Sequence, residues 1–180
     1  MIDPIAWYLL LSLAGWLALP LAFRLFSRLP DKGYALSRVL GLLLWGFVFW
    51  LLASLHIVPN EPGGIIFALV LIGGLSGWLL RGERWKEFWT WIKEKKTLIF
   101  GVEAVFFIAF WFWVLVRAAN PEILGTEKPM EMAFINAILR SPTFPPNDPW
   151  LSGYSISYYY FGYVLVAMLT SLTGVAGSIA

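Results

Sequence analysis

The chain has 180 residues, of which 59% are hydrophobic and 13% are charged, whereas about a quarter of the residues of a soluble domain are charged. This composition indicates a membrane protein and excludes an ordinary soluble domain. The formal net charge of +2 gives no indication of a nucleic-acid partner, and the lack of cysteine excludes disulfides and thiolate chemistry.

Apolar runs long enough to cross a bilayer occur at residues 5–26, 36–57, 64–80, 97–116 and 158–180. We therefore predict an all-α membrane protein with about five transmembrane helices and a long external loop that contains a short amphipathic helix. In chain order, we expect four transmembrane helices in 1–116, the external loop in 117–157 and the fifth transmembrane helix in 158–180.

The connection at 81–96, RGERWKEFWTWIKEKK, mixes tryptophans with charges. This pattern predicts a segment along the membrane surface, with its rings at head-group level and its lysines in water. Basic residues gather there and around the first connection, whereas the second connection has none. Because short cytoplasmic loops retain positive charge, we expect a multi-pass protein of the cell membrane whose N-terminus and 117–157 loop are external.

Two further features lie inside the apolar runs. Glu103 is an ionisable residue in the fourth run, and we expect it to reach the interface or to pair with a lysine of 93–96. Small residues spaced four apart permit close helix packing. Such pairs predict that the third and fifth runs pack within the bundle, and they are Gly73 with Gly77 and Gly174 with Ser178.

The start of the last apolar run, SISYYYFGY at 155–163, contains four of the seven tyrosines. An aromatic belt at the outer interface accounts for such a cluster. However, successive helical residues lie about 100° apart, so Tyr158, Tyr159 and Tyr160 cannot all face lipid. We expect at least one of them to point into the protein.

Within the long loop, GTEKPMEMAFINAILRS at 125–141 predicts a short amphipathic helix. Thr126 is the expected N-cap, and Pro129 falls in the first turn, where its missing N–H costs least. The expected apolar stripe consists of Met130, Phe134 and Ile138, and the acidic stripe of Glu127 and Glu131. The following SPTFPPNDPWLSGYS is rich in proline, which predicts extended and turn geometry.

The run EKPMEMAFINAILRSPTFPPNDPWLSGYSISYYYFGY at 127–163 resembles the signature of a family of multi-span membrane proteins of unknown function in archaea and certain bacteria, often labelled the YYY domain. That family distantly resembles the GT-C class of glycosyltransferases, which move sugars from polyprenyl-phosphate carriers on the outer side of the membrane. The resemblance implies a transferase with a polyprenyl-phosphate-linked sugar donor. It also implies that the chain is the N-terminal part of a longer protein, inactive without the parent's further transmembrane helices.

The same resemblance implies roles for particular residues of the external loop. Such a transfer needs a carboxylate that accepts the acceptor's proton or helps to hold a divalent metal, and cationic or hydroxyl groups that hold the phosphate. The expected catalytic residues are Glu127 and Asp148. The expected substrate-binding residues are Lys128, Glu131, Arg140, Tyr158, Tyr159, Tyr160 and Tyr163.

The residues alone leave other interpretations open. Two carboxylates four residues apart also form a solvated helix face, and Asp148 in NDP also fits simple turn chemistry. The alternative function is a non-catalytic membrane scaffold or transporter component whose external loop packs as a lid. Charged or broken helices at mid-bilayer would favour a transporter.

Overall fold

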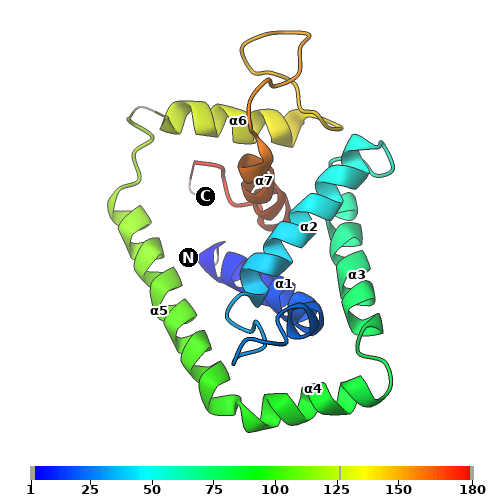
Figure 1. Cartoon of the computed structure of the whole chain (residues 1–180). Coiled ribbons are helices and arrows are strands. Elements are labelled where there is room, and N and C mark those ends of the chain that lie inside the picture. The colour runs from blue at the N-terminus through cyan, green and yellow to red at the C-terminus, as the bar shows by residue number, and fades with distance from the viewer. Residues whose placement is uncertain (1–2, 126, 179–180) are drawn as a thin grey trace. The chain divides into compact units, whose positions relative to one another are not determined.

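The computed structural model describes residues 3–125 and 127–178, which form seven α-helices and no strand (Figure 1). The all-α prediction is confirmed. The helices are α1 (Asp3–Leu25), α2 (Ser37–Ser54), α3 (Pro62–Trp78), α4 (Glu83–Glu94), α5 (Lys96–Ala119), α6 (Lys128–Arg140) and α7 (Phe161–Thr173).

Several helices are suited to cross a membrane. In the described residues, α1 (from Pro4), α2 and α5 are long and apolar enough to do so. Helix α3 has 17 residues, or about 26 Å at 1.5 Å per residue, and the chain bends by 99° between α3 and α4. Counting this bent pair as one span gives four candidate spans, which cover the first four predicted runs.

The helix in the last predicted run is shorter than expected. It begins at Phe161, and it ends where Gly174 takes the left-handed conformation (φ 72°) that closes many helices. Its 13 residues extend about 20 Å, less than the roughly 30 Å of a hydrocarbon core. The tyrosines at 158–160 therefore precede the helix rather than form its first turn.

Contacts divide the chain into two compact units. The loop unit consists of the described residues of 1–7, 45–69 and 120–180, and the arginine unit consists of 8–44 and 70–119. Helices α1, α2 and α3 contribute residues to both units.

An aromatic cluster forms the core of the arginine unit. Phe23 of α1 makes edge contacts with Phe88 and Trp91 of α4, with ring centroids 5.4 and 5.5 Å apart. Tyr34 joins them, and Ile99 and Val102 of α5 pack against the cluster. The apolar side of α4 is thus buried, while its Trp85 and Trp89 are exposed.

Helix α1 contains Pro20, whose missing N–H and ring disturb helical bonding. Ser76 of α3, which is only 1% exposed, accepts a hydrogen bond from the backbone N–H of Leu21 at 3.2 Å. Backbone groups at membrane depth need such partners because no water is present. The hydroxyl therefore joins α1 to α3 beside the proline.

Helices α1 and α2 approach closely at two glycines. A Cβ on Gly15 would lie 2.7 Å from Cγ of Arg38, and a Cβ on Gly41 would collide with the carbonyl group of Ala14. In the predicted pair of the third run, Gly73 lies against Leu17, whereas a Cβ on Gly77 would meet no described atom within 4 Å. The closest approaches thus occur at glycines outside the predicted pairs.

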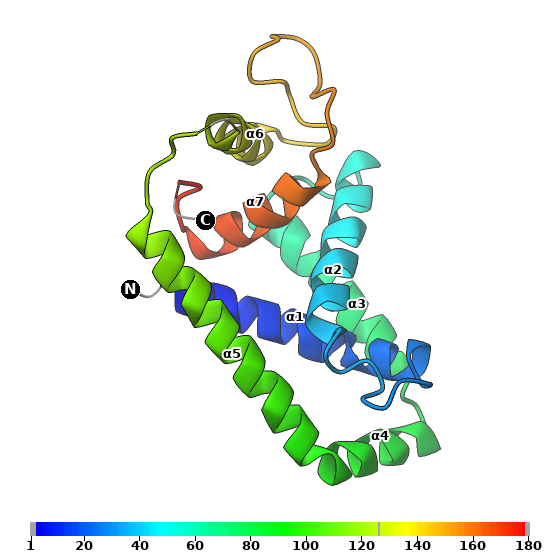
Figure 2. The same ribbon diagram turned by 60° about the vertical axis from the view of Figure 1, so that its left-hand side comes forward.

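Helices α6 and α7 pack on each other in the loop unit (Figure 2). Phe134 and Ile138 are buried, and Met130 packs against the same core, which confirms the predicted apolar stripe. Pro129 lies in the first turn, as predicted. Thr126 lies outside the described residues; the N-cap is Glu127, whose side chain makes no capping hydrogen bond.

The connection between α2 and α3 is tied to the end of α6 through Asn60. The Asn60 side-chain amide donates hydrogen bonds to the carbonyls of Ile138 (2.6 Å) and Ser141 (2.7 Å). Its backbone N–H donates to the carbonyl of Pro142 at 2.8 Å. One asparagine thus satisfies three carbonyls where α6 ends.

We expect Asn60→Ala to lower the free energy of unfolding by about 1–2 kcal/mol, because it removes two part-buried hydrogen bonds at the end of α6. Asn136 is a matched control, since among the described residues its amide bonds to the Met132 carbonyl one helical turn away. Denaturant unfolding in mixed micelles should show Asn136→Ala within about 0.5 kcal/mol of the unchanged chain. Equal losses of unfolding free energy in the two variants would contradict the stabilising role of the Asn60 side chain.

Candidate functional site

The predicted catalytic carboxylate lies at the start of α6. Glu127 is exposed, and the backbone N–H of Glu131 donates to its carbonyl at 2.9 Å. Glu127, Glu131 and Phe134 share one side of the helix, because they are spaced by four and three residues. Lys128 lies at the same end, with its ammonium donating to the Glu122 carbonyl at 3.1 Å.

Arg140 lies at the opposite end of α6 and is exposed. The 13-residue helix separates it from Glu127 by roughly 20 Å at 1.5 Å per residue. The structure therefore brings Lys128, but not Arg140, to the acidic end of the helix.

Asp148 organises the turn at the tip of the 141–160 loop. Its Oδ1 accepts hydrogen bonds from the backbone N–H groups of Trp150 and Leu151, both at 2.8 Å. Its own N–H donates to the Tyr154 carbonyl at 2.9 Å. This geometry favours the turn interpretation, and a chemical role for Asp148 stays a prediction.

The three consecutive tyrosines face different surroundings. Tyr160 points inward, where its hydroxyl accepts a hydrogen bond from Nε1 of Trp50 at 3.0 Å and its ring stacks on Phe144. Tyr159 is 78% exposed. The hydroxyl of Tyr158 donates to that of Tyr159 at 2.6 Å, and their ring centroids are 3.9 Å apart. The expectation of an inward tyrosine is met by Tyr160.

Three aromatic rings pack around the buried ring of Phe134 of α6. The centroid of Phe134 lies 5.4–5.5 Å from those of Trp150, Tyr158 and Tyr163. The negative charge of Glu127 acts on the phenols of Tyr158 and Tyr163, and that of Glu131 acts on Tyr163. We call this set the acidic–aromatic surface; its members are Glu127, Glu131, Phe134, Trp150, Tyr158, Tyr159 and Tyr163.

The hydrogen bond from Tyr158 to Tyr159 raises the pKa of Tyr158 to about 12. The nearby charge of Glu127 acts in the same direction. Tyr158 is therefore neutral at physiological pH, and it presents a hydroxyl group rather than a charge.

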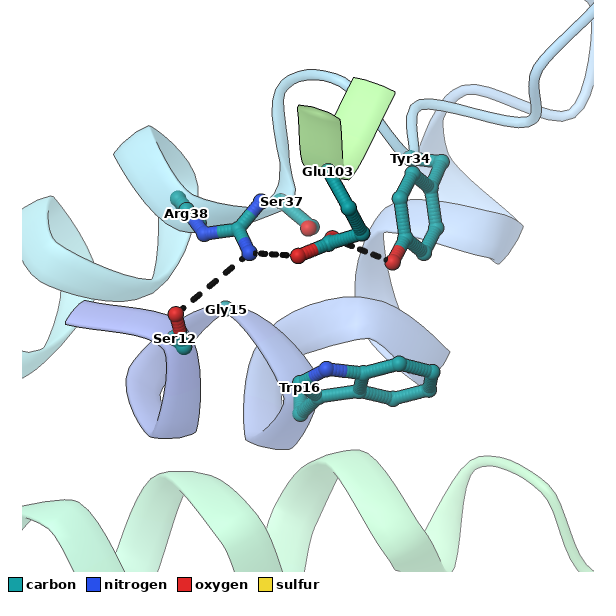
Figure 3. Close-up of a pocket in the computed structure, with 7 residues that line it drawn as sticks. All are labelled: Ser12, Gly15, Trp16, Tyr34, Ser37, Arg38 and Glu103. Carbon is teal, nitrogen blue, oxygen red and sulfur yellow. Dashed lines mark hydrogen bonds and ion pairs between the residues drawn. The ribbon is translucent and has the colours of Figure 1, made fainter. Parts of the chain in front are cut away.

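A second polar cluster lies in the arginine unit (Figure 3). Arg38 of α2 forms a hydrogen-bonded ion pair with Glu103 of α5 and lies over the ring of Phe106, 4.1 Å from its centroid. The Tyr34 hydroxyl donates to the other oxygen of Glu103 at 2.6 Å, and Arg38 also donates to Ser12 of α1. The expected partners of Glu103, a lysine among Lys93, Lys95 and Lys96, are thus replaced by Arg38 and Tyr34.

This cluster is closed and structural in character. Its side chains leave no room for a water-sized molecule between them, so no ligand fits there. Burial, followed by the hydrogen bond to Glu103, raises the pKa of the Tyr34 hydroxyl, which keeps it a donor. The sequence held a signal for the pair, because Arg38 lies inside a predicted apolar run and a buried charge needs a partner.

A metal site built from protein groups alone has no support in the described residues. Within 3–125 and 127–178, no group of three or more His, Asp or Glu side chains could hold a metal ion. Mg²⁺ is usually bound by one or two carboxylates together with substrate phosphates. Glu127 and Glu131 fit that smaller requirement.

Comparison with known proteins places the chain in a family. The family model described as "Uncharacterized membrane protein (DUF2298)" matches residues 44–180, and the chain belongs to this family of membrane proteins. No curated protein and no solved structure matches the chain. The match includes the whole acidic–aromatic surface, whereas Arg38 precedes it.

Replacing Tyr159 by phenylalanine should lower the pKa of Tyr158 toward the ordinary tyrosine value of about 10, because the hydrogen bond that favours its neutral form is lost. In the unchanged chain this bond stabilises the fold below about pH 10 and is lost as pH rises through about 12. Absorbance titration at 295 nm, with and without Tyr158→Phe, reports the midpoint. Tyr154→Phe is the control, and a Tyr158 midpoint still near 12 in Tyr159→Phe would contradict the assignment.

We expect Glu103→Gln to lower the free energy of unfolding by about 3 kcal/mol, because it leaves the Arg38 charge unpaired among apolar helices. The side chains of Arg38 and Glu103 are 10% and 29% exposed, whereas those of the surface pair Lys86 and Glu83 are 75% and 87% exposed. The same change at Glu83 should therefore cost under about 1 kcal/mol.

The double variant Arg38→Met/Glu103→Leu should recover most of this loss, since it removes both charges. Unfolding in mixed micelles measures all three variants. A Glu103→Gln loss no larger than the Glu83→Gln loss would show that the pair is not buried in solution.

Proposed function

We propose that the chain forms part of a GT-C-like membrane transferase that uses a polyprenyl-phosphate-linked sugar. The acidic–aromatic surface is the site that holds the sugar, and the loop that carries it faces the outside of the cell. The observation that carries this proposal is the gathering of exposed rings and two carboxylates around Phe134.

The chemistry of a sugar matches this surface. A pyranose has apolar C–H faces, which stack on aromatic rings, and a rim of hydroxyl groups. Trp150, Tyr158 and Tyr159 are 62%, 39% and 78% exposed, so their rings are available for stacking. Carboxylate oxygens accept hydrogen bonds from sugar hydroxyls, and the phenols both donate and accept. An interfacial aromatic belt requires the rings but not the carboxylates.

Glu127 is placed to act as the general base. Within the described residues its carboxylate has no hydrogen-bond or ion-pair partner, so it is free to accept a proton. In the transfer, the acceptor oxygen attacks the anomeric carbon while the bond from that carbon to the phosphate oxygen breaks. The acceptor's proton passes to Glu127, and the bonding electrons leave with the polyprenyl phosphate.

The phosphate needs a positive neighbour as it leaves. Lys128 supplies one at the same helix end, whereas Arg140 is too far away to share this role. A divalent metal, when bound by Glu127 and Glu131, would neutralise part of the same charge.

The transporter alternative gains little from the described residues. Its expected sign is a charged group at membrane depth, and the Arg38–Glu103 pair is such a group. However, the pair encloses no space for a substrate, so it is better explained as a link between helices. A non-catalytic scaffold is the remaining competitor.

The proposal is tested by carrier binding to the chain in nanodiscs and by transfer in native membranes. We expect a polyprenyl-phosphate-linked hexose to raise the melting temperature more than the bare polyprenyl phosphate does. A ligand at a hundredfold excess over its Kd stabilises the folded state by about 2.7 kcal/mol. Trp150→Ala should reduce the difference between the two carriers, because it removes a stacking ring.

Glu127→Gln separates chemistry from binding. It should leave carrier binding within a few-fold but slow the consumption of carrier-linked sugar in native membranes at least about a hundredfold. Glu61→Gln, the same change at an exposed carboxylate of the second connection, is the control. Equal stabilisation by sugar-bearing and bare carriers across several sugars would end the proposal and favour the scaffold.

A further inference from the structure

A cavity lies in the arginine unit where the end of α1, the following connection and the start of α4 meet. Its volume is about 210 Å³, or roughly seven times the share of liquid water that one molecule occupies. The buried side chains of Phe23 and Leu80 give it an apolar floor. Three basic side chains line it from separate segments, and they are Arg24, Lys32 and Arg84.

Lys32 is held over this floor by the local backbone. Its φ of 49° is a left-handed conformation that costs a non-glycine residue about 1–2 kcal/mol. Asp31 supports the turn by accepting hydrogen bonds from the N–H groups of Gly33 (3.1 Å) and Ala35 (2.9 Å). The Lys32 ammonium donates to the Ser27 carbonyl at 2.9 Å and lies 5.7 Å from the centroid of the Phe23 ring.

The cavity carries an excess of positive charge. Glu87 is the acidic side chain in its lining, against three cations. Among residues 3–125 and 127–178, neither Arg24 nor Arg84 has an ion-pair or hydrogen-bond partner. Like charges that converge on a cavity without internal partners repel one another, and an anion between them would remove that repulsion.

We propose that this cavity binds a phosphate group, supplied by the head group of an anionic phospholipid. Guanidinium and ammonium groups are suited to phosphate oxygens through charge-assisted hydrogen bonds, and the apolar floor is suited to the glycerol and first methylenes of the lipid. Basic pockets at the ends of membrane helices bind such head groups. The cavity shares no residue with the acidic–aromatic surface, so the proposal stands independently of the transferase.

The test uses the purified chain in an uncharged detergent, titrated with dioleoyl phosphatidylglycerol, dioleoyl phosphatidylcholine or inorganic phosphate. Binding is measured by native mass spectrometry and by the melting temperature. We expect phosphatidylglycerol to bind at least tenfold more tightly than phosphatidylcholine. Arg24→Gln/Arg84→Gln should weaken phosphatidylglycerol binding about thirtyfold, at about 1 kcal/mol per removed cation.

Two further variants make the result specific. Arg28→Gln/Arg81→Gln removes the same charge from neighbouring exposed positions outside the lining, and it should change the Kd less than about threefold. Glu87→Gln removes the opposing carboxylate and should tighten binding about fivefold. Because all five side chains are exposed, helical circular dichroism should be unchanged.

Inorganic phosphate distinguishes the source of the ligand. Displacement of phosphatidylglycerol by millimolar phosphate would support a phosphate site. If phosphate alone binds with the same dependence on Arg24 and Arg84, the site is still a phosphate site, but the source of the ligand is free phosphate. Equal weakening by the two double variants, or no preference for phosphatidylglycerol over phosphatidylcholine, would overturn the proposal.

Discussion

The arginine unit depends on the requirement that a charge among apolar helices must find a partner. Apolar side chains pack against one another with little preference when lipid is the competing neighbour. Helix α5 illustrates the problem, because none of its residues is buried. Its ion pair with Arg38, together with the Tyr34 hydroxyl, selects one orientation of α5 against α1 and α2. Gly15 makes this possible by leaving room for the Arg38 stem.

The loop unit uses a different principle, in which aromatic side chains are divided between a core and a surface. Phe144 and Tyr160 face inward and anchor both sides of the 141–160 loop. Trp150, Tyr158 and Tyr159 remain outside. Because the inner rings hold the backbone, the outer rings keep fixed positions despite their exposure. The binding role that we propose for these rings would then require little ordering of the loop at the moment of binding.

Long periodic features were predictable from the sequence, whereas contacts between distant residues were not. The apolar runs located the helices α1, α2, α3 and α5, and the stripe containing Phe134 located the buried side of α6. The helix in the last run is shorter than the run itself, because apolar composition gives no sign of Gly174, whose left-handed backbone ends α7. Trp150 contacts Phe134 because the turn at Asp148 brings the two rings together. No local sequence pattern predicts this contact. Arg38 lies within an apolar run, and a charge in such a place indicates a buried partner.

Connections between helices usually tolerate changes in length, because they make few contacts of their own. The connection between α2 and α3 differs, since Asn60 binds carbonyls 78 and 81 residues further along the chain. An insertion or deletion there would move this side chain away from the end of α6 and release the 141–160 loop. Evolutionary length variation should therefore be suppressed in this short exposed segment, even though it lies outside the acidic–aromatic surface.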